Sequence, residues 1–232
     1  MTDYTEIYNK QAQQYELLVS REDYQHNILR ALQQMVPLEG AAVVELGAGT
    51  GRLTCILVPL VKSITAFDRS AHMLNLARQK LLQSGLNNWF LEVGEHQHVN
   101  VLDGSVDVLI SGWSICYVAV ENPAAWQAEL ETVLSEMQRV LLPGGYIILL
   151  ETLGTGFEEP NPPVDLLTYF AYLEARGFQR TWIRTDYCFQ NRAEAEGSAR
   201  FFFGEEMIAK IREDERGVIL PECTGIWWLI KE

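Results

Sequence analysis

The run Val43-Val44-Glu45-Leu46-Gly47-Ala48-Gly49-Thr50-Gly51-Arg52 decides the fold of this chain. An apolar stretch breaks there into three glycines at every second position, and the carboxylate of Glu45 comes just before them. The stretch 41–46 predicts a buried strand. The glycines predict a turn in which the backbone approaches a ligand without interference from a Cβ atom. Since the segment from Arg52 onward predicts the start of a helix, the run has the strand, loop and helix order of a nucleotide-type site.

The spacing of the glycines indicates which ligand the loop binds. A dinucleotide fingerprint has the form G-x-G-x-x-G and requires glycine at position 52, but Arg52 stands there and the third glycine, Gly51, comes one residue early. Glu45 would repel a pyrophosphate and suits a cationic ligand. S-adenosyl-L-methionine carries a sulfonium and an ammonium group and no phosphate, so the run predicts S-adenosylmethionine as the cofactor.

Length, composition and charge restrict the class of protein. The 232 residues, of which 48% are hydrophobic, suffice for a single α/β domain, and we expect one domain over 1–232. A net charge of −13 and a pI of about 4.8 predict no nucleic-acid partner and no anionic membrane surface as partner. The sequence does not predict the oligomeric state.

Cysteines, histidines and the N-terminal composition restrict the compartment and the metal chemistry. The four cysteines are scattered and form no C-x-x-C pair, which is typical of free thiols in a reducing compartment. The N-terminus has no signal-type pattern and no run approaches 18 apolar residues. We therefore expect a cytoplasmic protein. His96 and His98 lie close in sequence without a third ligand, so no metal site is predicted.

The remaining sequence alternates predicted strands with predicted helices, which favours an α/β fold with a doubly wound, mostly parallel sheet. Ser70 is expected to cap a helix. The strands are expected at 41–46, 63–67, 88–93, 106–110, 146–150, 178–189 and 224–230, and the helices at 4–36 as a pair, 52–61, 70–82, 122–142, 165–176 and 192–212.

Polar residues follow four of these strands at the point where each strand ends. Asp68 follows the second strand, near the spacing of about 20 residues at which an acid after the glycine loop reaches a ribose diol. Glu95 and His96 follow the third strand, where a carboxylate suits an adenine amino group. The run 111–114, Ser-Gly-Trp-Ser, follows the fourth and is expected near the sulfonium. Because ligands of open α/β sheets bind outside the carboxyl ends of the strands, these groups are expected to form one site.

These motifs, in this order, resemble those of the class I S-adenosylmethionine-dependent methyltransferases, and most closely the broad group that acts on small molecules. The matching parts are 43–54, Asp68, Gly94-Glu95, 106–114 and 141–151. The resemblance implies a Rossmann-like, seven-stranded sheet whose last strand is antiparallel. It further implies a helical lid over 1–40, a cofactor-binding core over 41–151 and a substrate cap over 152–232.

The resemblance also implies roles for individual residues. Glu45, Gly47 and Gly49 would hold the methionine part, Asp68 the ribose, and the lid would contribute Tyr8 and Tyr15. Glu95 followed by His96 departs from the more usual Asp followed by a small residue. The full set expected to bind the cofactor is Tyr15, Glu45, Gly47, Ala48, Gly49, Thr50, Gly51, Asp68, Arg69, Met73, Glu95, His96 and Ser111. The residues expected to contact the acceptor are Trp113 and Tyr117, and less strongly Tyr187 and Phe203.

The sequence thus predicts a methyltransferase, a transferase that methylates a small molecule by in-line displacement. No residue is assigned as general base, because no position stands out for that role. Two alternatives stay open: a sensor or partner subunit that binds S-adenosylmethionine without catalysis, and an NAD-dependent oxidoreductase. The acceptor itself is not identified by any motif.

Overall fold

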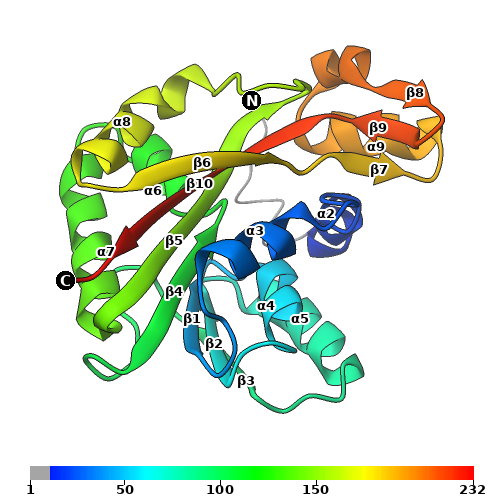
Figure 1. Cartoon of the computed structure of the whole chain (residues 1–232). Helices are drawn as coiled ribbons and strands as arrows, with labels where there is room; N and C mark the ends of the chain where they lie inside the picture. The colour runs from blue at the N-terminus through cyan, green and yellow to red at the C-terminus, as the bar shows by residue number, and fades with distance from the viewer. Residues whose placement is uncertain (1–10) are drawn as a thin grey trace.

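The main sheet of the protein has seven strands in the order β3-β2-β1-β4-β5-β10-β6, as seen in a computed structural model that describes residues 11–232 (Figure 1). Strand β10 pairs antiparallel with β5 and β6, while the other neighbouring pairs are parallel. The strands are β1 (Ala42–Leu46), β2 (Ser63–Asp68), β3 (Trp89–Val93), β4 (Val106–Gly112), β5 (Leu141–Thr155), β6 (Gln179–Arg184) and β10 (Glu222–Ile230). The predicted fold class, a mostly parallel sheet with its last strand reversed, is confirmed.

Helices cover both faces of this sheet, as the alternation of side chains along β1 requires. Val43 packs in the core on one face with residues of α3 and α4, whereas Val44 packs in the core on the other face with residues of α7 and α8. The helices are α2 (Ala12–Val19), α3 (Asn27–Met35), α4 (Arg52–Leu57), α5 (Ala71–Gln83), α6 (Cys116–Glu121), α7 (Trp126–Val140), α8 (Leu167–Ala175) and α9 (Arg192–Phe202), with 3-10 turns η1 (Val164–Leu166) and η2 (Glu205–Lys210).

Helix α5 has Ser70 as its N-cap, as predicted, whereas two other helices differ from the prediction. The Ser70 hydroxyl accepts a hydrogen bond from the Met73 N–H at 3.3 Å and caps α5. Helix α4 ends at Leu57, earlier than predicted, because Pro59 lacks the N–H that would continue the helical hydrogen bonds. Helix α6 has no counterpart in the prediction, which placed a loop before position 122.

Two predictions in the C-terminal third are wrong. The expected strand 178–189 is two strands, β6 in the main sheet and β7 (Tyr187–Phe189) in a second sheet. The last backbone hydrogen bond to the main sheet is donated by the Thr185 N–H to the Glu222 carbonyl, at 2.9 Å, and the backbone leaves the sheet after it. The apolar and polar alternation continues through this break and hides it. The expected helix 192–212 ends at Phe202, because Gly204 follows with φ 104.

The residues after this helix complete a second, three-stranded sheet in the order β7-β9-β8, with β8 at Arg212–Asp214 and β9 at Gly217–Leu220. Figure 1 shows this small sheet and α9 projecting from one end of the main sheet, with α2 lying below them. Helix α9 packs against α2 through the rings of Phe202 and Tyr15, whose centroids are 5.6 Å apart. Within residues 11–232 no helix is long and apolar enough to cross a membrane.

Candidate functional site

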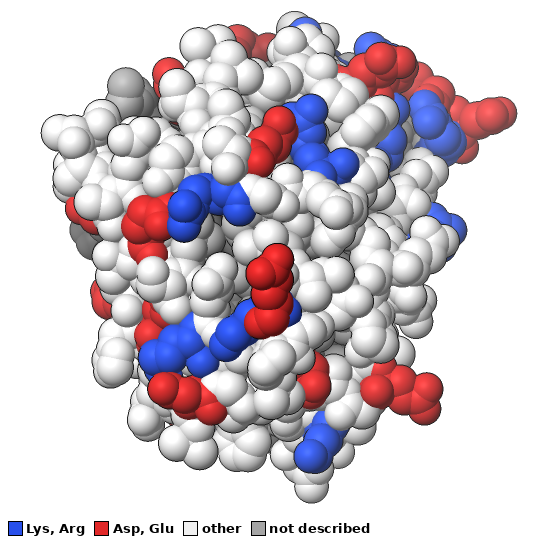
Figure 2. Space-filling view, turned by 60° about the vertical axis from the view of Figure 1, so that its left-hand side comes forward, with Lys and Arg blue, Asp and Glu red and all other residues white. Residues whose placement is uncertain are grey.

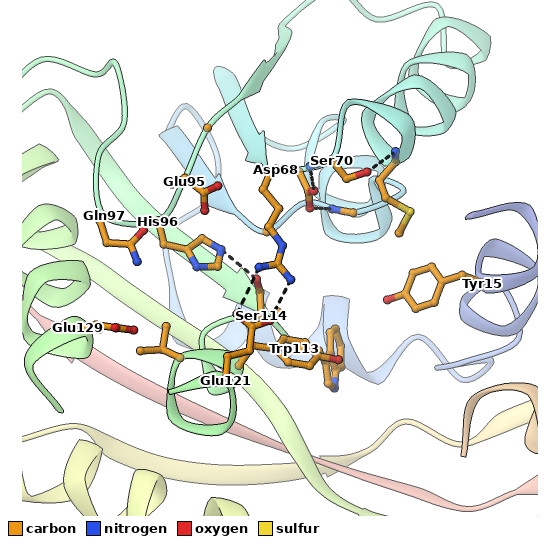
Figure 3. A pocket seen from close by; sticks show the side chains of 18 residues that line it. Tyr15, Asp68, Ser70, Glu95, His96, Gln97, Trp113, Ser114, Glu121 and Glu129 are labelled. Carbon is orange, nitrogen blue, oxygen red and sulfur yellow. Dashed lines mark hydrogen bonds and ion pairs between the residues drawn. The ribbon is translucent and has the colours of Figure 1, made fainter. Parts of the chain in front are cut away.

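A cavity with an empty volume of about 940 Å³ lies at the carboxyl ends of β1, β2, β3 and β4 (Figure 3). The residues that line it are Tyr15, Gly47, Gly49, Asp68, Arg69, Ser70, Met73, Gly94, Glu95, His96, Gln97, Gly112, Trp113, Ser114, Tyr117, Val118, Glu121 and Glu129. The cavity therefore brings together the ends of four strands, the lid helix α2 and the segment after β4. It is the place where an open α/β sheet binds its ligand.

The three glycines of the loop have positive φ angles of 71, 54 and 79, but each faces different surroundings. A Cβ atom on Gly51 would lie 2.8 Å from the Cβ of Ala77, so this glycine permits α5 to pack against the loop. A Cβ on Gly49 would meet only the Met73 Cε, at 3.7 Å. Gly49 thus leaves open space in the cavity wall, where backbone can approach a ligand.

Asp68 joins the loop to the start of α5. Its Oδ2 accepts a hydrogen bond from the Gly49 N–H at 2.7 Å, and its Oδ1 accepts one from the Ser70 N–H at 2.7 Å. Burial raises the pKa of this carboxyl, and the two backbone hydrogen bonds oppose that rise. Because each carboxylate oxygen can accept more than one hydrogen bond, Asp68 retains capacity to accept hydroxyl donors from the cavity.

His96 reaches from the end of β3 to the segment after β4. Its Nε2 lies 3.0 Å from the Ser114 Oγ. Burial lowers the pKa of His96 to about 4, so the ring is neutral at pH 7. Ser114 belongs to the motif that the sequence placed near the sulfonium, whereas Ser111 of the same motif does not line the cavity. The Ser111 hydroxyl instead donates to the Leu46 carbonyl at 2.8 Å and joins β4 to β1.

An ion pair joins two walls of the cavity. The Arg69 Nη2, from the residue after β2, lies 3.0 Å from the Oε1 of Glu121, the last residue of α6. The hydrogen bond to Glu121 raises the pKa of Arg69. Glu121 and Glu129 were missed by the sequence reasoning. The sequence feature that could have located Glu121 is the short apolar run before Asn122-Pro123. That run forms α6, which places Glu121 at the cavity.

Five residues expected to bind the cofactor lie outside the lining of the cavity: Glu45, Ala48, Thr50, Gly51 and Ser111. Glu45 is 2% exposed and accepts a hydrogen bond from the Thr54 hydroxyl at 2.6 Å. Burial raises its pKa to about 8, so it is mostly protonated at pH 7 and offers little charge to a cation. Glu45 therefore supports the loop from behind instead of facing the cavity.

Tyr15 and Trp113 also line the cavity. Trp113 has a φ of 52, which is unusual for a bulky residue. The Arg52 guanidinium lies 4.0 Å from the centre of the Trp113 ring, and its Nη1 lies 2.6 Å from the Glu22 Oε2. Tyr8, the other residue expected in the lid, lies outside the described residues.

Neither a metal-binding group of the described residues nor the carboxyl of Glu151 contributes to the cavity. Among residues 11–232 no group of three His, Cys, Asp or Glu side chains is placed to hold a metal ion. Glu151 lies within β5 and is 1% exposed, and its Oε1 accepts hydrogen bonds from the Cys116 N–H and the Tyr169 hydroxyl. Glu151 thus does not face the cavity, whereas Glu95, His96, Glu121 and Glu129 line it.

Comparison with known proteins agrees with this geometry. The model of a family described as a methyltransferase domain matches residues 44–149, which run from β1 into β5. A malonyl-[acyl-carrier protein] O-methyltransferase of Yersinia pestis is 34% identical over 56% of this chain and 42% of its own length. A demethylmenaquinone methyltransferase of Lactococcus lactis is 29% identical over 63% of this chain and 57% of its own length. The chain thus spans about half the length of these two relatives.

Solved structures share the fold at low sequence identity. The crystal structure of an S-adenosylmethionine-dependent methyltransferase from Aquifex aeolicus superposes with a TM-score of 0.56 and 17% identity, covering 88% of this chain and 89% of that chain. At this identity the likeness concerns the arrangement of helices and strands.

Proposed function

The chain belongs to the class I S-adenosylmethionine-dependent methyltransferases, and on that premise we propose that it methylates a small molecule with S-adenosylmethionine as the methyl donor. The observation that carries this proposal is the junction of Asp68 with the loop at Gly49. A half-buried carboxylate and an open stretch of glycine backbone meet there on the wall of one cavity. A carboxylate that can accept hydrogen bonds from a ribose diol, beside a backbone that a ligand can approach closely, suits a nucleoside.

The residues that would hold the cofactor are those with polar or apolar surface on the cavity. Asp68 would accept the ribose hydroxyls, Met73 would pack against the adenine, and Glu95 would accept its amino group. Gly47 and Gly49 would pass close to the methionine part, under the lid residue Tyr15. Arg69, His96 and Ser114 would complete the wall, while the buried Glu45, Ala48, Thr50, Gly51 and Ser111 would keep the loop in shape.

When bound, S-adenosylmethionine supplies a methyl group that its sulfonium already activates. The task of the chain is to align an acceptor atom at about 3–3.5 Å from that carbon and to exclude water. The bond from carbon to sulfur breaks as the bond to the acceptor forms, so in-line alignment matters more than proton transfer. An acceptor that is already nucleophilic needs no base.

The acceptor is proposed to be a small molecule. The relatives are named for different acceptors, a malonyl-carrying protein and a demethylmenaquinone, so neither is carried over to this chain. The charge of −13 disfavours nucleic acid. On the face shown in Figure 2, basic side chains are interspersed with acidic ones and form no broad basic area. The four unpaired cysteines support a reducing, cytoplasmic location as a prediction.

Ligand-dependent thermal unfolding tests the donor assignment. S-adenosylhomocysteine is expected to raise the unfolding temperature of the wild type, and NADH is not. Asp68→Ala is expected to lose that shift. Asp107→Ala is the matched control, because Asp107 also accepts a backbone N–H, from Ala42 at 2.8 Å, at the opposite end of the sheet. Equal affinity of Asp68→Ala and wild type for S-adenosylhomocysteine would disprove the ribose assignment.

Transfer of a tritiated methyl group to pooled small metabolites tests the catalytic part of the proposal. A transferase is expected to label at least one pool, and the label is expected to disappear in Asp68→Ala. A protein that binds S-adenosylhomocysteine and labels no pool would instead be a sensor or a partner subunit.

A further inference from the structure

The ion pair between Arg69 and Glu121 connects the two sides of the cavity. Arg69 follows β2, and Glu121 is the last residue of α6, the helix after β4. In the main sheet, β2 and β4 are the two neighbours of β1, and Gly47 follows the carboxyl end of β1. The two side chains therefore meet across the end of β1, close to the switch point where an open α/β sheet binds its ligand.

The exposure of the pair places it at the mouth of the cavity. Arg69 and Glu121 both line the cavity, yet their side chains are 46% and 50% exposed. A side chain that faces the cavity on one side and solvent on the other belongs to its rim. The Arg69 Nη1 and Nη2 donate to the Glu121 Oε2 and Oε1 at 3.3 and 3.0 Å. This bidentate geometry aligns the guanidinium with the carboxylate and holds the rim together.

Arg69 also lies beside the two carboxyls that are proposed to hold the adenosyl group. Its pKa is raised mainly by the hydrogen bond to Glu121, and the charges of Glu95 and Asp68 raise it further. Figure 3 shows Glu121 across the cavity from Asp68 and Glu95. Because the pair lies at the rim, an adenosyl group bound to Asp68 and Glu95 would lie on its inner side. The ligand would therefore pass the pair when it enters or leaves.

Helix α6, which carries Glu121, is fixed to its neighbours at both ends. At its start, the Cys116 N–H donates to the Glu151 Oε1 at 3.0 Å. Just after its end, the Asn122 Nδ2 donates to the Glu129 Oε1 at 2.6 Å. Opening of the mouth therefore depends on rotation of the two side chains of the pair and not on movement of the helix. An exposed ion pair permits this rotation because it is weak.

We propose that Arg69 and Glu121 form a latch at the mouth of the cavity, which must open each time S-adenosylmethionine enters and each time S-adenosylhomocysteine leaves. This inference rests on the proposed methyltransferase function and adds a step to its cycle. Methyl transfer leaves S-adenosylhomocysteine in the site, and this product has to depart before the next cofactor binds. The latch thus limits the exchange of product for cofactor.

A latch has a kinetic signature that an ordinary ligand contact lacks. It closes in the free protein as in the loaded protein, so it slows association and release by the same factor and leaves the dissociation constant unchanged. A side chain that only contacts the ligand slows release, and its loss raises the dissociation constant with little change in association. The two rate constants together therefore distinguish the two roles.

Surface plasmon resonance with S-adenosylhomocysteine measures both rate constants. Glu121→Gln is expected to raise each of them about two- to fivefold, which is the range that the strength of an exposed ion pair allows. In an Arg69→Gln background the same substitution is expected to have no further effect, since the charge pair is already lost. Glu131→Gln is the matched control. It breaks an ion pair with Arg176 that also measures 3.0 Å, with side chains 36% and 51% exposed, and neither residue lines the cavity.

The outcomes separate this inference from the proposed function. A wild type that does not bind S-adenosylhomocysteine would count against the proposed function. With binding intact, the latch is overturned if Glu121→Gln leaves both rate constants unchanged, if it changes release alone, or if Glu131→Gln has the same effect. It is also overturned if Glu121→Gln acts equally in the Arg69→Gln background. The latch gains support if about 1 M salt, which screens exposed charges, speeds exchange in the wild type more than in Glu121→Gln.

Discussion

The side chain of Ser114 occupies the space that a side chain at position 47 would need. A Cβ atom on Gly47 would lie 2.0 Å from the Ser114 Oγ and 2.3 Å from its Cβ. The first glycine of the loop is therefore required by a residue that follows β4, far away in the sequence. The second glycine has no such neighbour, because its open side faces the cavity.

This difference predicts unequal costs for two alanine substitutions in the loop. Both glycines have positive φ, so alanine costs about 1–2 kcal/mol of strain at either position. Gly47→Ala adds the collision with Ser114, which is expected to cost roughly a further 1–3 kcal/mol of unfolding free energy. We expect chemical denaturation to show Gly47→Ala as clearly less stable than Gly49→Ala. Gly49→Val, by contrast, is expected to fold and to lose affinity for S-adenosylhomocysteine. Equal stability of the two alanine variants would contradict the packing argument.

The buried and exposed ion pairs of the site predict different costs. Arg52→Leu leaves the carboxylate of Glu22 buried without its partner, which is expected to cost about 3–5 kcal/mol of unfolding free energy. Arg69→Leu breaks the pair with Glu121, whose side chains are 46% and 50% exposed, and is expected to cost no more than about 1 kcal/mol. Urea denaturation of both variants at pH 7 measures the difference. Similar losses of unfolding free energy in the two variants would show that burial of the Arg52–Glu22 pair does not increase its contribution to stability.

Glu222 predicts how stability depends on pH. Its pKa in the folded protein, about 8, lies above its ordinary value of 4.5. The contribution of Glu222 to stability is therefore fully present below pH 4.5 and is lost as the pH rises through about 8. Each unit of this difference is worth about 1.4 kcal/mol. Glu222→Gln removes the dependence, so its stability relative to wild type is expected to rise by at least about 2 kcal/mol between pH 5 and pH 8.

Glu136 supplies a control with the opposite sign. Hydrogen bonds from Arg139 lower its pKa below 4.5, so its contribution is present above that value and lost as the pH falls. Glu136→Gln is expected to destabilise the protein at neutral pH and to approach wild type in acid. If Glu222→Gln also loses stability at pH 8, the raised pKa of Glu222 is wrong.

Neutral His96 predicts that ligand binding is insensitive to mild acid. Burial holds the pKa of His96 at about 4, so the ring keeps its hydrogen bond with Ser114 in the same protonation state from pH 8 to about pH 5. Affinity for S-adenosylhomocysteine, measured by calorimetry, is expected to show no step near pH 6.5. A step there that His96→Gln abolishes would mean that the ring titrates normally.

The sequence by itself determined the main sheet, the glycine loop and the position of Asp68. These features depend on neighbours in the chain: an apolar run makes β1, closely spaced glycines make the turn, and Ser70 caps α5 directly after Asp68. Because the carboxyl ends of parallel strands share one edge, strand ends alone were enough to bring Asp68, Glu95 and the segment after β4 to one cavity.

Only the tertiary structure decided which side chains face that cavity and which are covered. Glu45 and Ser111 have the right residue types and positions, but they point into packed elements and bond Thr54 and Leu46. The buried pair of Arg52 in α4 with Glu22 in the turn after α2, and its neighbour Glu222 in β10, depend on how distant parts of the chain pack together. Local pattern carries no information on such contacts, since burial and pairing depend on residues that the chain brings near only after it folds.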